Sequence, residues 1–145
     1  MSDHVFAFAI GDMAKATGVS TPTIRFYESI GLLPEPVRSQ ARQRVYSAAD
    51  VDRLTFVRRC RDFGFGIEEV RVLLAASVRS DMDCASARDM VAAHLAGLRQ
   101  RLAEMKLLET QLAGFVRLCD DSCAGGAARD CAIFADLSAA SAGCG

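Results

Sequence analysis

The sequence predicts a mainly α-helical protein: a winged helix-turn-helix unit with a small β wing, a long antiparallel coiled-coil helix, and a loop with a tail. Three observations predict this fold class. Two short helical segments meet at a glycine turn, apolar residues later recur in heptads, and cysteines flank the heptad segment. With 145 residues, of which 51% are hydrophobic, the chain is long enough to bury a core. We expect three parts, at residues 1–76, 77–118 and 119–145.

Two helices and a turn are predicted near the start of the chain. The first helix covers 10–16 and ends at Gly18, since glycine is a frequent C-terminal helix breaker. The second covers 21–29, with Ser20 as its N-cap and Pro22 in its first turn. In a helix-turn-helix, the second helix enters the major groove of DNA with its N-terminal residues leading. The candidate DNA contacts on this helix are Thr21, Thr23 and Arg25.

A wing and two further helices are predicted next. Residues 37–46 contain no acidic residue and carry three arginines suited to the DNA backbone, Arg38, Arg42 and Arg44. Ser47 and Asp50 form a capping-box-like start for a helix that Gly64 ends. We expect its apolar positions to be Leu54, Phe56, Val57 and Phe63. A further helix follows from Ile67 to Ala76, with inward-facing Val70, Leu73 and Leu74.

The basic residues concentrate in this front part of the chain. Lys15 to Arg61 contains nine basic and four acidic residues, a net charge of +5, although the whole chain has a formal charge of −1. From Ala76 onward, seven basic and nine acidic residues give −2. An arginine-rich surface attracts phosphate groups, so we expect double-stranded DNA as a partner despite the near-neutral total.

Residues 10–74 resemble the MerR-type transcriptional regulators. The resemblance rests on the segments Ile10-Gly11-Asp12-Met13-Ala14, Gly18-Val19, Thr23-Ile24-Arg25-Phe26-Tyr27-Glu28, Gly31-Leu32-Leu33, Arg44-Val45-Tyr46 and Phe63-Gly64-Phe65. It implies a winged helix-turn-helix that binds promoter DNA as a homodimer. By position, the resemblance implies recognition-helix contacts at Arg25 and Tyr27, wing contacts at Arg38 and Arg44, and a backbone contact at Arg61. Arg42-Gln43 stand where this family usually carries Gly-Tyr, and the extra arginine adds phosphate affinity.

A long helix is predicted from Cys84 to Cys119, because this stretch contains no proline. Apolar residues alternate in steps of four and three along it: Val91, Leu95, Leu98, Leu102, Met105, Leu112 and Val116. This heptad pattern favours a dimer seam. Cys84 and Cys119 lie in phase with the seam and 35 residues apart. That spacing is about 50 Å along a helix, so only an antiparallel partner brings Cys84 of one chain beside Cys119 of the other.

The cysteines predict a metal site at each end of the dimer helix. A glycine-rich loop carries Cys123 and Cys131 after Cys119, and thiolates select soft metals such as Zn, Cd, Hg, Pb or Cu(I). Either Cys119 or Cys123 is the principal ligand beside Cys131, or both bind. The resemblance favours a divalent ion, because divalent sensors of this family carry the helix-start cysteine, here Cys84 from the partner chain. Two further thiols are a bystander, Cys60, and an accessory thiol, Cys144.

The predicted function is therefore metal-dependent transcription regulation. The resemblance implies that the metal-bound dimer distorts promoter DNA and so realigns the contacts of RNA polymerase. A thiol redox or iron–sulfur sensor of the same fold, or a Cu(I) sensor, is the alternative. No catalytic pair or phosphate loop supports an enzyme. No apolar run approaches the about 20 residues that span a bilayer, and the start lacks a basic signal region, so we expect a cytoplasmic protein without a membrane partner.

Overall fold

The computed structural model describes residues 7–79, 81, 83–122 and 125–139. It divides the chain into two compact units, Met1–Arg88 and Asp89–Gly145. The predicted parts divide instead at 76/77 and 118/119, and this division stays a prediction. No helix among the described residues is long and apolar enough to cross a membrane.

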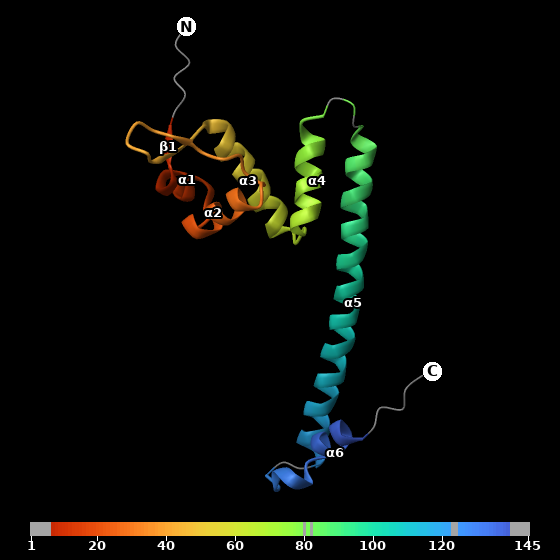
Figure 1. The fold of residues 1–145 in the computed structure, drawn as a ribbon. Helices are drawn as coiled ribbons and strands as arrows, with labels where there is room; N and C mark the ends of the chain where they lie inside the picture. The colour runs from red at the N-terminus through yellow and green to blue at the C-terminus, as the bar shows by residue number, and fades with distance from the viewer. Residues whose placement is uncertain (1–6, 80, 82, 123–124, 140–145) are drawn as a thin grey trace. The chain divides into compact units, whose positions relative to one another are not determined.

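The first unit contains a three-stranded antiparallel sheet and four helices (Figure 1). The strands are β1 (Phe8–Ala9), β2 (Val37–Arg38) and β3 (Arg44–Tyr46), in the order β1-β3-β2. The helices are α1 (Ile10–Thr17), α2 (Thr21–Ser29), α3 (Ala48–Asp62) and α4 (Ile67–Ser77). The mainly helical fold with a small wing is thereby confirmed, and each predicted helix lies within one residue of its expected start.

Local sequence signals set the helix starts. The Ser20 hydroxyl accepts the Thr23 amide at 3.4 Å at the start of α2, and Pro22 lies in its first turn. At the start of α3, the Ser47 amide donates to the Asp50 carboxylate at 2.8 Å, and the Asp50 amide donates back to the Ser47 hydroxyl at 3.2 Å. Both predicted N-caps are confirmed, and each satisfies helix donors that would otherwise be unpaired.

Two features of the turn between α1 and α2 favour glycine at position 18. Gly18 has a φ of 70°, in the left-handed region that glycine adopts without steric cost. A Cβ at this position would lie 2.4 Å from Nη1 of Arg58. That guanidinium donates to the Thr17 carbonyl at 2.6 Å, so α3 holds the end of α1 through the space that the missing side chain leaves.

One apolar core joins these elements. Its fully buried side chains come from every helix of this unit and from the turn after α2: Met13, Ile24, Leu32, Leu54, Val57 and Val70. Phe56 and Leu73 pack partly buried against it, as predicted. Phe63, which the sequence predicts as an apolar position of α3, lies at the C-terminal cap of that helix and is 64% exposed, so it is not part of the core. Phe65, two residues later, is buried instead.

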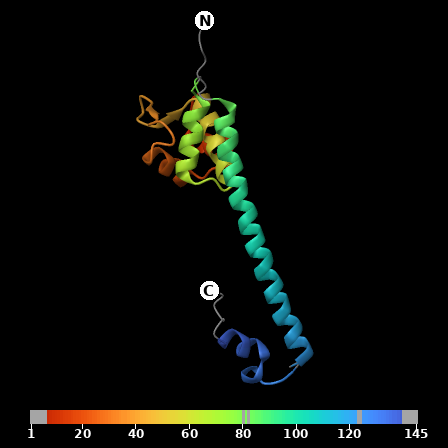
Figure 2. The ribbon, with the colours of Figure 1, turned by 90° about the vertical axis from the view of Figure 1, so that its right-hand side faces the viewer.

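The long helix α5 (Cys84–Ser122) begins in the first unit and continues into the second, where a 3₁₀ turn, η1 (Ala128–Asp130), and a short helix, α6 (Ala132–Ser138), follow it. After α5 the chain reverses direction into η1 and α6 (Figure 2). Helix α5 extends past Cys119, where the predicted long helix ends, so Cys119 lies in its last turn. No residue of α5 is buried within the single chain.

Candidate metal site and DNA-binding surface

Two cysteines meet where the chain folds back at the end of α5. Cys119 lies in the last turn of that helix, and Cys131 is the N-cap of α6. Their sulfur atoms are 3.9 Å apart, and both side chains are partly buried. A disulfide would need about 2.05 Å between the sulfurs, so the two thiols are neighbours without an S–S bond.

The fold of the loop brings this pair together. Gly125 has a φ of 91°, which allows the chain to reverse after α5. The η1 turn then closes with hydrogen bonds from the Asp130 amide to the Ala127 carbonyl at 3.0 Å and from the Cys131 amide to the Ala128 carbonyl at 3.1 Å. The 12-residue separation in sequence thus becomes a contact between side chains.

The spacing of the two sulfurs fits a shared soft metal ion. With the zinc–sulfur bond length of about 2.3 Å, two thiolates lie about 3.8 Å apart around a tetrahedral ion, about 4.0 Å around a trigonal ion and about 4.6 Å around a linear one. The observed 3.9 Å matches the tetrahedral and trigonal arrangements. Within the described parts of one chain, no three His, Cys, Asp or Glu residues lie close enough together to hold an ion. Within one chain, the described residues thus bring together two candidate thiolate ligands, Cys119 and Cys131.

The other predicted thiols have different surroundings. Cys84 is the first residue of α5 and is exposed. Asp83, which precedes it, accepts the Ser86 amide at 3.0 Å, and hydrogen bonds from Ser86 lower the pKa of the Asp83 carboxyl. Cys123 and Cys144 lie outside the described residues. Cys60 packs against the core of the first unit, and burial raises the pKa of its thiol, which fits a structural role.

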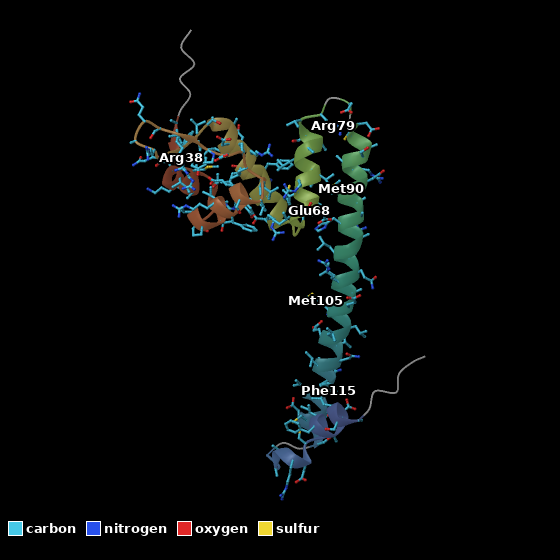
Figure 3. All side chains as sticks on the ribbon, viewed as in Figure 1. Arg38, Glu68, Arg79, Met90, Met105 and Phe115 are labelled. Carbon is cyan, nitrogen blue, oxygen red and sulfur yellow. The ribbon has the colours of Figure 1, made fainter. Side chains whose placement is uncertain are left out.

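Arginines from α2 and the wing surround one shallow depression of about 220 Å³. Its charged lining consists of Arg25, Arg38, Arg42 and Arg44. In Figure 3, Arg38 lies among the nitrogen-bearing side chains at this edge of the unit. A second depression of about 270 Å³ is lined by Arg25, Arg38 and Arg44 together with Glu28 and Glu35. The four arginines that sequence predicts as DNA contacts on α2 and the wing thus face one concave, positively charged surface, as phosphate binding requires.

The wing turn places Arg42 in an unusual conformation. Its φ is 58°, so Arg42 is in the left-handed region, and no other non-glycine residue in the described ranges has a positive φ. The turn is closed by hydrogen bonds from the Arg42 amide to the Ser39 carbonyl at 2.8 Å and from the Ser39 amide to the Gln43 carbonyl at 2.9 Å. Arg38 donates to the Arg42 carbonyl at 3.2 Å. Arg42-Gln43 in this turn stand where the resemblance predicts Gly-Tyr.

Three of the predicted DNA contacts have structural roles. Tyr27 is 7% exposed and its ring belongs to the core, so its predicted DNA contact stays a prediction. Arg61 donates to the Phe65 carbonyl at 2.6 Å and holds the turn after α3. The Thr23 hydroxyl lies 2.7 Å from the Ser20 hydroxyl within the N-cap of α2. Thr21 is partly buried at the start of the same helix.

Sequence reasoning missed the carboxylate that joins α2 to the wing. Glu28, in the last turn of α2, accepts a hydrogen bond from the Tyr46 hydroxyl and lies 3.4 Å from Nε of Arg44. Strand β1 was also not predicted; it pairs with β3 through Phe8 and Tyr46. No local pattern marks either feature, because both depend on partners far along the chain.

Comparison with known proteins decides the family. Residues 8–77 match the family model for MerR HTH family regulatory proteins, and residues 51–115 match the model for MerR, DNA binding. The chain is 33% identical over 115 residues to the mercuric resistance operon regulatory protein of Bacillus cereus, covering 79% of this chain and 87% of that protein. The chain belongs to the MerR family.

Other MerR-family relatives extend the similarity into the second unit. The chain is 35% identical over 136 residues to heavy metal-dependent transcription regulator 2 of Rhizobium meliloti, covering 92% of this chain and 88% of that protein. It is 36% identical to a transcription regulator from Ralstonia metallidurans in complex with lead(II), with a TM-score of 0.77 and coverage of 90% and 99% of the two chains. These relatives are transcription regulators, so the prediction that the chain is not an enzyme is confirmed.

Proposed function

We propose that this MerR-family chain is a metal-sensing regulator that binds a two-fold promoter operator as a homodimer. A soft divalent ion (Zn, Cd, Hg or Pb) binds the thiolates of Cys119 and Cys131, with Cys84 donated by the partner chain and Cys123 as a further ligand. Metal binding then activates transcription by distorting the DNA between the contact elements of RNA polymerase.

The separation of 3.9 Å between the sulfurs of Cys119 and Cys131 is the observation that carries this proposal. Two thiolates at that distance suit three- or four-coordinate binding of a soft ion, whereas a linear complex would need about 4.6 Å. The similarity to mercury-, lead- and heavy metal-dependent regulators supports the same class of ligand.

The apolar face of α5 supports a homodimer. The seam residues are solvent-exposed in the single chain, with Val91 at 49%, Met105 at 64% and Val116 at 58%. Figure 3 labels Met105, one of these seam residues, on α5. A groove of about 720 Å³ near the end of α5, lined by residues such as Leu112, Phe115 and Leu137, leaves further apolar surface without a partner in the single chain. Antiparallel pairing of two α5 helices covers these side chains and completes each thiol site with Cys84 of the other chain.

The ion acts on the DNA through the dimer. A metal bound between the end of one α5 and the start of the other fixes their junction, and so favours one of two arrangements of the DNA-binding units. The operator is bound in both arrangements, so metal changes operator affinity little. Only the metal-bound arrangement distorts the promoter. The proposed DNA contacts are Arg25, Arg38, Arg42 and Arg44.

Metal titration tests the proposal directly. Reduced, metal-free protein is titrated with Hg, Cd, Pb, Zn and Cu(I), read by thiolate-to-metal charge-transfer absorption and native mass spectrometry. We expect two ions per dimer. Replacing a ligand, as in Cys119→Ser or Cys131→Ser, lowers affinity by more than the about 10–100-fold that changes around a metal site typically cost. Cys60→Ser is the matched control and leaves binding unchanged.

The partner's contribution is tested with Cys84→Ser. This change abolishes the transcriptional response to divalent ions and leaves operator binding intact. One ion per dimer, or a normal response to every divalent ion in this variant, contradicts the cross-dimer site.

Thiol redox sensing is the second candidate, favoured by the same pair of sulfurs. Hydrogen peroxide would take two electrons and two protons from Cys119 and Cys131 and leave a disulfide and two water molecules. Mass spectrometry after peroxide treatment, without reductant, detects the loss of two hydrogens. Peroxide-dependent transcription in the absence of metal favours this candidate over metal sensing.

A further inference from the structure

A carboxylate in the DNA-binding unit joins α2 to the wing. Glu28 lies in the last turn of α2, and its side chain is only 9% exposed. One carboxylate oxygen accepts the Tyr46 hydroxyl, and the other lies 3.4 Å from Nε of Arg44. Burying a carboxylate costs free energy unless it is paired, so these two partners explain how Glu28 is accommodated.

Both partners project from one face of β3. Residues two apart in a strand lie on the same side, which brings Arg44 and Tyr46 to one carboxylate. Tyr46 is 2% exposed, and it is held in the sheet opposite Phe8. Burial, and then the hydrogen bond to Glu28, raise the pKa of the Tyr46 hydroxyl, which therefore stays a donor. Glu28 is thus anchored to a buried residue of the core.

Arg44 links this anchor to the basic surface. Its Nε is buried and has no hydrogen-bond partner among the residues described, so Glu28 compensates it as an ion pair. The side chain is still 32% exposed and lines both depressions beside Arg25 and Arg38. A guanidinium carries five N–H donors, so pairing at Nε leaves its outer donors for a phosphate.

We propose that Glu28 is a positioning residue for DNA binding, which holds Arg44 in line with Arg25 so that α2 and the wing present their phosphate contacts in one geometry. This inference rests on the DNA-binding function proposed above. Glu28 itself touches no DNA; it acts through Arg44. Without it, Arg44 gains freedom to move and the wing loses a tie to α2.

The test measures DNA affinity as a function of salt concentration. The probes are a duplex selected by the wild-type protein from a random-sequence library and a scrambled duplex of the same composition. Wild type, Glu28→Gln, Arg44→Gln and the double variant are compared. For Glu28→Gln, we expect about a 10-fold loss of affinity for the selected duplex and a salt slope lower by about 1, as for Arg44→Gln. The double variant shows no further loss, because both changes remove the same contact.

Opposite results overturn the inference. If Glu28 only repels phosphate, Glu28→Gln binds more tightly with an unchanged salt slope. If it acts independently of Arg44, the two losses add in the double variant. Should Glu28→Gln melt at a much lower temperature, Tyr46→Phe provides the second variant, since it removes one anchor and keeps the ring; we expect a smaller loss of affinity, and an unchanged affinity counts against the anchor. Wild-type protein that does not distinguish the two duplexes contradicts the proposed function itself, whereas discrimination with a normal Glu28→Gln contradicts only the role of Glu28.

Discussion

The two compact units bury their apolar residues in different ways. In the first unit, six large side chains from four helices and a turn are essentially fully buried within one chain. In α5, all of which the structure describes, no residue is buried, although the helix carries a regular apolar stripe. The first unit therefore has an apolar core within one chain, whereas the apolar stripe of α5 is exposed in the single chain and is the surface that the proposed dimer would cover.

The largest effect is expected from a charge introduced into the apolar stripe of α5. Leu102 is 65% exposed in the single chain but lies at the centre of the predicted seam. Leu102→Asp buries an uncompensated charge from each chain in the dimer, at a cost of about 3–5 kcal/mol. We expect dimer dissociation at least about 100-fold more favourable, by sedimentation equilibrium, with loss of operator binding.

Ala103→Asp is the matched control. It adds the same charge one residue further along α5, away from the stripe, and the dimer persists. If both variants remain dimeric, the stripe is not the seam. If both dissociate, net charge rather than the stripe controls association.

Substitutions at two glycines, Gly18 and Gly11, are expected to change the stability of the first unit in opposite directions. Gly18→Ala forces a side chain into the left-handed region and displaces the Arg58 guanidinium, at a cost of about 1–3 kcal/mol in the free energy of unfolding. Gly11 lies inside α1 with open space around it, so Gly11→Ala stabilises by about 1 kcal/mol. Urea unfolding measures both changes, and equal effects of the two would mean that the local geometry of Gly18 does not matter.

The smallest expected effect concerns the wing. Arg42→Gly relieves the positive φ, which costs an ordinary residue about 1–2 kcal/mol, while glycine's greater freedom in the unfolded chain offsets about half of that gain. We expect a net stabilisation below about 1 kcal/mol and a DNA-binding salt slope lower by about 1.

For Arg42→Gly, which removes both the charge and the backbone strain, the control is Arg42→Lys. It keeps the charge and the strained backbone, so both the unfolding free energy and the salt slope stay close to those of the wild type. A normal salt slope in Arg42→Gly would remove Arg42 from the DNA surface.

Much of the fold could be predicted because its signals are local. The Ser20 and Ser47 caps, the glycine after α1 and the heptads of α5 each act through residues within a few positions of one another. The same holds for the basic wing, where three arginines stand within seven residues without an acid.

Local sequence signals predicted the candidate site only in part. Spacing left Cys119 and Cys123 as alternatives beside Cys131, and the structure places the Cys119 sulfur 3.9 Å from that of Cys131. The sequence pattern also did not predict whether the Tyr27 side chain faces the core or the surface. One aromatic residue on a short amphipathic helix suits either the core or a ligand, and packing put Tyr27 inside.

The sequence by itself determined the helices, their caps, the basic front segment, the heptad stripe and the family resemblance, because each follows from short-range periodicity and residue type. Only the tertiary structure decided which arginines face one concave surface, that Arg61 holds a turn, and that Glu28 joins α2 to β3. Those outcomes depend on contacts between residues up to about 20 positions apart, whose free energies are set by burial and geometry rather than by neighbours in the chain.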